Sequence, residues 1–238
     1  MIAAICRVRD EADIIGYTTE HMLQECDLVI VSDNGSVDGT RDILEDLGKK
    51  YSHLTIVDDP DHRHWQGART TELMHQAGRM GAEWVIPYDA DEWWPVVTPE
   101  DADVVLMRSH VFLPDPSDDL TEENPLLRMT HRLLPYEPFP KVAFRYHWTA
   151  AIREGNHDVK HPGLRRVQVE GMRHYQYRSL EQVKRKVRQG TKALEATELS
   201  PSTGGHWRQL ASLDDDQMSQ WWTEYLNQPK IKTTPLGL

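Results

Sequence analysis

Two aspartates separated by one residue, Asp89 and Asp91, have the type and spacing that suggest chemistry. They directly follow the apolar segment from Trp84 to Tyr88, and Glu92 adds a third acidic side chain. Carboxylates this close repel one another unless a cation lies between them, and oxygen ligands suit Mg²⁺ or Mn²⁺. The pattern predicts a divalent metal site in which Asp91 is the direct ligand and Asp89 faces a ribose or holds a metal-bound water. A solvated turn without metal is the alternative.

Short apolar segments that alternate with amphipathic helices would position this motif. Strands are predicted at residues 2–8, 28–31, 54–57 and 84–88. Helices are predicted after the first three strands, the first with Asp10 as its N-cap, the second beginning at Asp38 to Thr40, and the third at residues 67–80. This order predicts right-handed crossovers and a doubly wound, mostly parallel α/β sheet. Ligands of such sheets bind beyond the carboxyl ends of the strands.

Polar residues also follow the first two predicted strands. Arg7, Arg9 and Glu11 place charges at the end of the first strand, and Asp33 comes directly after the second. A carboxylate at that position could accept the N–H of a nucleobase, although a turn before a capped helix is the simpler alternative. Three polar strand ends at one sheet edge favour a common ligand crevice.

Composition limits the class of protein. The chain has 238 residues, 39% of them hydrophobic, and a net charge of −11, which argues against a surface that coats nucleic acid. Cys6 and Cys26 are expected to be buried thiols in a reducing compartment. Because no apolar segment reaches the roughly 18 residues that a membrane helix needs, a cytoplasmic protein is expected.

The segments 9–13, 31–40 and 88–92 resemble family 2 glycosyltransferases of GT-A fold, over about the first 95 residues. The resemblance implies an inverting enzyme of small bacterial or phage type that uses Mn²⁺ or Mg²⁺. It would transfer a sugar from a nucleoside diphosphate, expected to be uridine diphosphate, to a hydroxyl group of a protein or glycan. The residues expected at the donor nucleotide are Arg7, Arg9, Glu11, Asp33, Gly67, Arg69, Asp89 and Ala90.

The resemblance also suggests residues later in the chain. His157 is expected as a further metal ligand beside Asp89 and Asp91, and Glu154 and Asp158 are the candidates for the catalytic base. The segment 174–179 resembles small bacterial and phage transferases, and its basic groups could meet the diphosphate. The alternative is a solvated basic surface.

The resemblance divides the expected fold into three parts. Residues 1–95 would form the nucleotide-sugar-binding half of the GT-A domain, residues 96–178 its acceptor-side and metal-completing part, and residues 179–238 a C-terminal helical extension. Trp93 and Trp94 could form a sugar platform, with one of them in the core, whereas Trp221 and Trp222 suggest packing or an oligomer contact.

Two other functions stay open. A nucleotidyltransferase that makes sugar nucleotides would need a glycine-rich basic loop after the first strand, where this chain has Arg9 to Glu11. A non-catalytic module that binds a nucleotide sugar would have little use for paired carboxylates, since unused ones only destabilise their surroundings.

Overall fold

A computed structural model describes residues 1–197 and 204–236 and divides them into two compact units. Unit 1 consists of Met1–Pro60, Trp65–His110 and Pro135–His174. Unit 2 consists of Asp61–His64, Val111–Leu134 and the described residues from Tyr175 onward. Each unit therefore combines segments that are distant in the sequence. The expected helical extension at 179–238 falls partly on residues 198–203 and 237–238, which lie outside the described residues.

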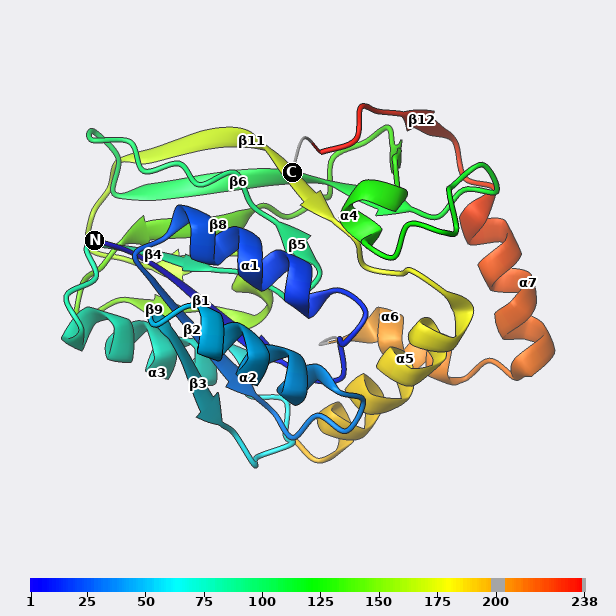
Figure 1. The fold of residues 1–238 in the computed structure, drawn as a ribbon, viewed down its shortest axis with the longest axis horizontal. Coiled ribbons are helices and arrows are strands. Elements are labelled where there is room, and N and C mark those ends of the chain that lie inside the picture. Colours follow the sequence, from blue (N-terminus) through cyan, green and yellow to red (C-terminus); the bar gives the residue numbers. More distant parts are fainter. Residues whose placement is uncertain (198–203, 237–238) are drawn as a thin grey trace. The chain divides into compact units, whose positions relative to one another are not determined.

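A mixed sheet forms the centre of unit 1 (Figure 1). Its strand order is β3 (Leu54–Asp58), β2 (Leu28–Asp33), β1 (Ile2–Val8), β4 (Trp84–Pro87), β8 (Lys141–Arg145) and β6 (Val104–Leu113). β1 pairs in parallel with β2 and β4, and β2 with β3, whereas β8 is antiparallel to both β4 and β6. The parallel part confirms the predicted βαβ order, and its carboxyl ends meet at one edge.

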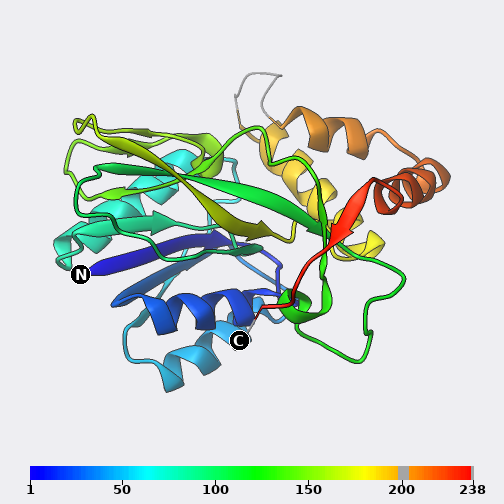
Figure 2. The ribbon, with the colours of Figure 1, turned by 90° about the horizontal axis from the view of Figure 1, so that it is seen from above.

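Helices cover both faces of the parallel strands (Figure 2). α1 (Ile15–Glu25) and α2 (Thr40–Lys50) pack on the face to which Ala4 and Cys6 of β1 point. α3 (Gln66–Arg79) packs on the other face, against Ala3 and Ile5. The near-continuous apolar sequence of β1 follows from this arrangement, because a strand buried on both faces needs apolar residues at every position.

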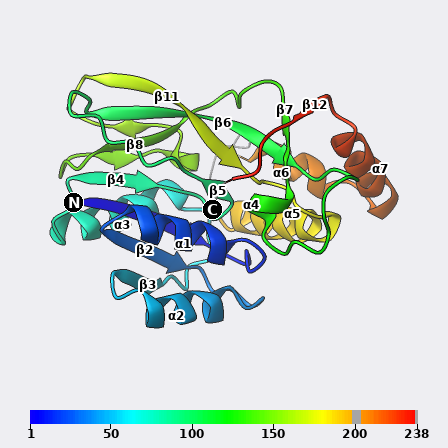
Figure 3. The same cartoon turned by 45° about the horizontal axis from the view of Figure 1, so that its top comes forward.

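Short strands complete unit 1 (Figure 3). β5 (Glu92–Trp93) pairs antiparallel with β11 (Arg166–His174), so that Glu92 lies opposite His174. β9 (Ala151–Ile152) and β10 (Val159–Lys160) form a separate hairpin around the 3₁₀ turn η1 (Glu154–Asn156). The pairing of β5 with β11 therefore brings residues about eighty positions apart next to the Asp-x-Asp segment.

Unit 2 has a core of its own. β7 (His131–Leu133) pairs with the end of β6 and with β12 (Lys230–Lys232). Its helices are α4 (Pro125–Arg128), α5 (Leu180–Glu195), α6 (Gly205–Ala211) and α7 (Asp215–Leu226). Trp221 and Trp222 pack against the apolar cluster of this unit, and residues 115–124 form turns without helix or strand. Among the described residues, no helix has the length and apolar character needed to cross a membrane.

One local prediction was wrong. Asp10 does not cap α1: its backbone φ is 52°, and its Oδ1 accepts a hydrogen bond from Val37 N at 2.6 Å. This difference arises from tertiary contacts that override local sequence preference. Gly190 lies inside α5, where a Cβ atom would come within 2.4 Å of the Trp207 ring, so close packing explains this glycine.

Candidate functional site

The Asp-x-Asp segment forms a tight turn between β4 and β5. Glu92 N donates to Asp89 O at 3.0 Å, and Asp89 N donates to Glu92 Oε2 at 2.9 Å. Glu92 is fully buried, and the same Oε2 accepts from Trp94 Nε1 at 3.0 Å. The carbonyl of Ala90 accepts from Thr18 Oγ1 at 2.8 Å, which ties the turn to α1. Glu92 therefore organises the backbone that carries the two aspartates.

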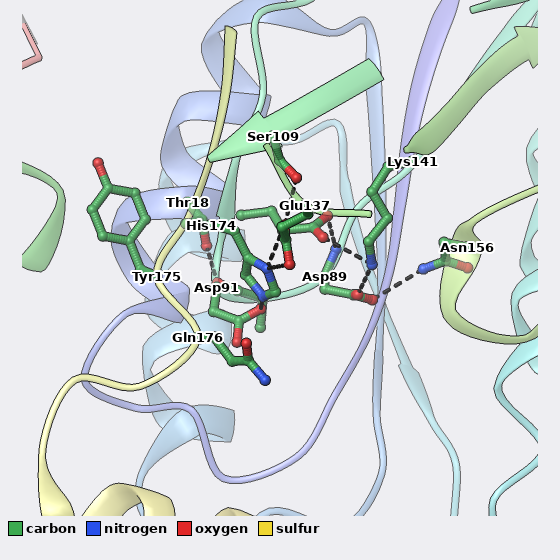
Figure 4. Close-up of polar contacts among 12 residues, drawn as sticks. Thr18, Asp89, Asp91, Ser109, Glu137, Lys141, Asn156, His174, Tyr175 and Gln176 are labelled. Atoms are coloured by element: carbon green, nitrogen blue, oxygen red, sulfur yellow. Dashed lines mark hydrogen bonds and ion pairs between the residues drawn. The ribbon is translucent and has the colours of Figure 1, made fainter. Parts of the chain in front are cut away.

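Lys141, the first residue of β8, supplies a cation to this turn (Figure 4). Its Nζ donates to Asp89 Oδ2 and pairs with Glu92 Oε1 at 2.9 Å, and its side chain is 5% exposed. Burial opposes the charged form of a lysine, but Asp89 and Glu92 outweigh it and raise the pKa of Lys141. The ammonium is therefore a fixed internal charge beside the first aspartate.

Two amides complete the surroundings of Asp89. Its Oδ1 accepts from Gln66 Nε2 and from Asn156 Nδ2, each at 3.0 Å. Asn156 is 2% exposed and adopts a left-handed backbone with φ of 57°, which asparagine tolerates better than most residues. Three donors therefore hold Asp89 in one orientation.

Asp91 has a different partner. His174 Nε2 lies 3.5 Å from Asp91 Oδ1, and His174 Nδ1 lies 3.0 Å from both carboxylate oxygens of Glu137. Burial opposes the charged imidazole, but Glu137 and Asp91 outweigh it and raise the pKa of His174 well above its ordinary value. Burial also opposes ionisation of Glu137, yet His174 and Ser109 lower the pKa of Glu137 to about 2. The pair is therefore charged at neutral pH.

The carboxyl ends of β1 and β2 lie side by side, with Val8 opposite Asp33. Asp33 is 6% exposed; its Oδ1 accepts from Ser36 N at 3.1 Å, and Arg41 lies 4.0 Å from its Oδ2. Glu11 N donates to Thr40 Oγ1 at 2.9 Å, which ties the end of β1 to the start of α2.

The predicted arginines lie beside acidic residues. Arg7 Nε donates to Asp59 Oδ2 at 2.7 Å, and Arg69 Nε lies 3.9 Å from the other oxygen of Asp59. Arg9 Nε lies 3.9 Å from Asp10 Oδ2. Arg7 and Arg69 thus come together around one buried carboxylate, and their roles at a nucleotide stay predictions.

The residues predicted around η1 have local partners. Gly67 N donates to Glu154 Oε1 at 3.1 Å, and a Cβ at Gly67 would lie 2.9 Å from Ile152 O. Close packing of α3 on β9 therefore explains this glycine without a nucleotide. His157 Nδ1 lies 3.1 Å from Pro140 O, and burial together with Lys141 lowers the pKa of His157.

Asp158 is held by arginine. It accepts from Arg166 Nη1 and from Val159 N, each at 2.8 Å, and Arg153 lies 3.6 Å away. Burial opposes its ionisation, but these hydrogen bonds and charges lower the pKa of Asp158. The roles of Glu154, His157 and Asp158 stay predictions.

The adjacent tryptophans separate as expected into one core and one partly exposed residue. Trp94 is 1% exposed. Trp93 stacks on His21 with ring centroids 4.9 Å apart, and the Arg173 guanidinium lies 5.9 Å from its centroid. Trp93 is therefore the tryptophan available for a platform.

Sequence reasoning missed the roles of Lys141, Glu137 and Asn156, and it assigned His174 only to a basic segment. The signals in the sequence are weak: Lys141 is the first residue of β8, and His174 is the last residue of β11. A buried strand that begins or ends in a charged residue next to an acidic turn is the pattern that could have drawn attention to them.

An α/β sheet with acidic residues at the carboxyl ends of β2 and β4 is the arrangement of a GT-A glycosyltransferase. Residues 8–157 match the family model described as glycosyl transferase family 2. Because this match covers more than half of the 238 residues, the chain belongs to glycosyl transferase family 2, and it is a glycosyltransferase.

Among solved structures, the chain is similar to the mannosyltransferase PcManGT from Pyrobaculum calidifontis, described in complex with GDP-Man and Mn²⁺. The two are 22% identical over 44% of this chain and 34% of that chain, with a TM-score of 0.35. The match thus spans about a third of the mannosyltransferase chain. No curated protein matches the chain.

Proposed function

We propose that the protein is a metal-dependent, inverting glycosyltransferase. It moves a sugar from a nucleoside diphosphate, with uridine diphosphate as the first candidate, to a hydroxyl group of a protein or glycan. Family membership supports glycosyl transfer. One observation supports the metal dependence: Asp91, just past β4, faces the imidazole of His174, whose other nitrogen is held by Glu137.

This arrangement fits a divalent ion. The distance of 3.5 Å from His174 Nε2 to Asp91 Oδ1 exceeds the usual hydrogen-bond length, and a carboxylate on the far imidazole nitrogen is typical of metal-ligating histidines. Within the described residues no group of three histidine, cysteine or acidic side chains could hold a metal by itself. Mg²⁺ sites often take one or two protein carboxylates and complete their shell with substrate phosphates and water.

Asp91 and His174 would therefore hold the ion together with the donor diphosphate. The geometry favours His174 over the predicted His157 for this role, because His174 Nε2 lies 3.5 Å from Asp91 Oδ1, whereas the contact of His157 Nδ1 is with Pro140 O. When bound, the ion would neutralise the charge that develops on the leaving diphosphate.

The other strand ends would bind the nucleotide. Asp33 would accept the N–H of the base, Asp89 would accept a ribose hydroxyl, and Arg7 and Arg69 would lie toward the phosphates. The shared contact of both arginines with Asp59 supports this placement, because an anion near them would compete with a single buried carboxylate. Arg9 and Glu11 would close the site from the end of β1.

An inverting transfer needs a carboxylate that takes the proton of the acceptor hydroxyl. Glu154 and Asp158 are the two candidates. Glu154 accepts from a neutral backbone N–H, whereas Asp158 is bonded to Arg166. A carboxylate paired with a guanidinium is a weaker base, so we place Glu154 first.

The test measures cleavage of sugar nucleotides by the purified protein, with Mn²⁺ or with a chelator. We expect release of nucleoside diphosphate that depends on metal, and a loss of at least about 100-fold in Asp91→Asn, the size typical for removing transition-state charge stabilisation. Asp46→Asn is the matched control, because the Asp46 side chain is 75% exposed on α2. Equal activity of Asp91→Asn and wild type would refute the metal role, and consumption of nucleoside triphosphate with release of pyrophosphate would refute the transfer reaction.

A further inference from the structure

We infer that Lys141 is a positioning residue that separates the functions of the two aspartates. It neutralises Asp89 within the protein and so leaves Asp91 as the carboxylate that binds the divalent ion. The inference rests on the proposed function, since it concerns the same metal site, and it adds a residue that the Asp-x-Asp pattern does not include.

The contacts of Lys141 are unusual for a lysine. Its side chain is 5% exposed, and its ammonium group pairs with Asp89 on one side and Glu92 on the other. A buried ammonium is costly unless such partners compensate it, and removing one partner of a buried pair is strongly destabilising. Lys141 is therefore fixed in place by the same turn that it neutralises.

Asp89 has few free positions for a metal ion. Lys141 binds Oδ2, and Asn156 donates to Oδ1 (Figure 4). Gln66 also donates to Oδ1. A metal that bound Asp89 directly would have to displace a buried ammonium and break charge-assisted hydrogen bonds, which are the stronger kind. The remaining exposed part of Asp89 can still accept a hydroxyl group of the donor.

Asp91 is different because its partner is an imidazole, which can itself act as a metal ligand. His174 Nε2 lies 3.5 Å from Asp91 Oδ1, beyond the usual length of a hydrogen bond, and an ammonium nitrogen has no lone pair with which to bind a metal. The two aspartates have the same type and lie two residues apart, yet one is paired with a fixed ammonium group and the other lies beside an imidazole. Lys141 makes this difference.

The experiment measures binding of Mn²⁺ alone to the full chain by the electron paramagnetic resonance signal of free Mn²⁺. Asp89→Asn should keep the Mn²⁺ Kd within about threefold of the wild-type value. Asp91→Asn should raise the Mn²⁺ Kd at least tenfold. The double variant Lys141→Met/Glu92→Gln frees Asp89 without leaving Glu92 as a buried unpaired charge. It should bind Mn²⁺ about tenfold more tightly, because the net charge of the site is unchanged while Asp89 becomes available as a second carboxylate ligand.

Adding Asp89→Asn to the double variant should return the Kd to the wild-type range, because the gained affinity comes from that carboxylate. Lys160→Met is the matched control: it removes the same charge from an exposed position of β10 and should leave the Kd unchanged. Activity supplies a second readout, since capture of the metal by Asp89 should lower kcat while the affinity for Mn²⁺ rises. If Lys141 and Glu92 had only a structural role, the double variant would lower both kcat and the affinity for Mn²⁺.

Two results would overturn the inference while leaving the proposed function intact. One is loss of Mn²⁺ binding in Asp89→Asn, which would make Asp89 a direct ligand. The other is a folded double variant whose Mn²⁺ Kd equals or exceeds that of wild type. If the wild-type protein bound no Mn²⁺ in the presence or absence of donor, the metal dependence itself would fail, and the inference with it.

Discussion

Replacing Lys141 with methionine should destabilise unit 1 because it leaves a fully buried carboxylate without its cation. Glu92 is 0% exposed, and Lys141 Nζ lies 2.9 Å from its Oε1. Breaking a buried ion pair by removing one partner typically costs about 3–5 kcal/mol. Asp89 is 25% exposed and keeps two amide donors, so Glu92 should account for most of the loss. We therefore expect the unfolding free energy to fall by about 3 kcal/mol, the lower end of this range.

The assay is thermal unfolding of Lys141→Met at pH 7, followed by circular dichroism. A loss of about 3 kcal/mol corresponds to a fall in Tm of roughly 6–12 °C for a chain of this size. Lys49→Met is the control, because Lys49 also pairs with an aspartate, Asp46, but both side chains are about three-quarters exposed. Its transition should coincide with that of wild type.

The dependence on pH and a second variant sharpen this prediction. Burial raises the pKa of Glu92 even against the attraction of Lys141, so Glu92 should take up a proton once the ammonium is gone. A carboxyl whose folded-state pKa is raised destabilises the fold as the pH rises from its unfolded pKa, and most strongly above its folded-state pKa. The loss of stability in Lys141→Met should therefore be smaller at pH 5 than at pH 7. In Lys141→Met/Glu92→Gln the glutamine oxygen can still accept from Trp94 Nε1, and at least half of the stability should return.

The reasoning would be refuted if Lys141→Met lost less than about 1 kcal/mol at pH 7. It would also be refuted if the double variant were no more stable than the single one, because the cost would then not come from an unpaired Glu92.

Two further predictions concern Glu137 and Gly67. The folded-state pKa of Glu137 is about 2, below the ordinary value, so its stabilisation is complete above the unfolded pKa and is lost as the pH falls toward 2. In Glu137→Gln the unfolding free energy should therefore depend less on pH than in wild type. Between pH 2 and 5 its change should be smaller by up to about 3 kcal/mol. An equal dependence of the unfolding free energy on pH in the two proteins would contradict the pairing of Glu137 with His174. Gly67→Ala should destabilise the protein by about 1–3 kcal/mol in thermal unfolding, because its Cβ would lie 2.9 Å from Ile152 O. Gly205→Ala is the control in the same experiment, since a Cβ at Gly205 would have open space around it.

The parallel part of the fold was predictable because its signals are local. β1 was predicted with its observed bounds, and the strands at Leu28, Leu54 and Trp84 were each found within two residues of their ends. A strand buried on both faces is a continuous apolar segment, and it can be recognised without knowing its neighbours. The position of Asp33 at the end of β2 and of Asp91 beyond β4 followed directly.

The partners of those aspartates were not predictable in the same way. Lys141 lies 52 positions after Asp89, and its place is set by the antiparallel pairing of β8 with β4 and β6. His174 reaches the site through the pairing of β11 with the two-residue strand β5, which has no sequence pattern of its own. Strand pairing of this kind depends on register between distant segments, and a shift by one residue would turn each side chain to the opposite face.

The sequence presents Asp89 and Asp91 as equivalent, and the structure distinguishes them by their cations. Asp89 meets an ammonium group that two carboxylates keep charged despite its burial, whereas Asp91 meets an imidazole that a third carboxylate orients. Since a divalent ion competes with whichever cation is already present, its choice between the two aspartates depends on which cation yields more easily. An imidazole nitrogen can itself bind a metal, whereas a lysine ammonium group would have to be expelled from the core. Under the proposed function, residues far from the motif in sequence would therefore determine which of its carboxylates serves the metal and which the donor.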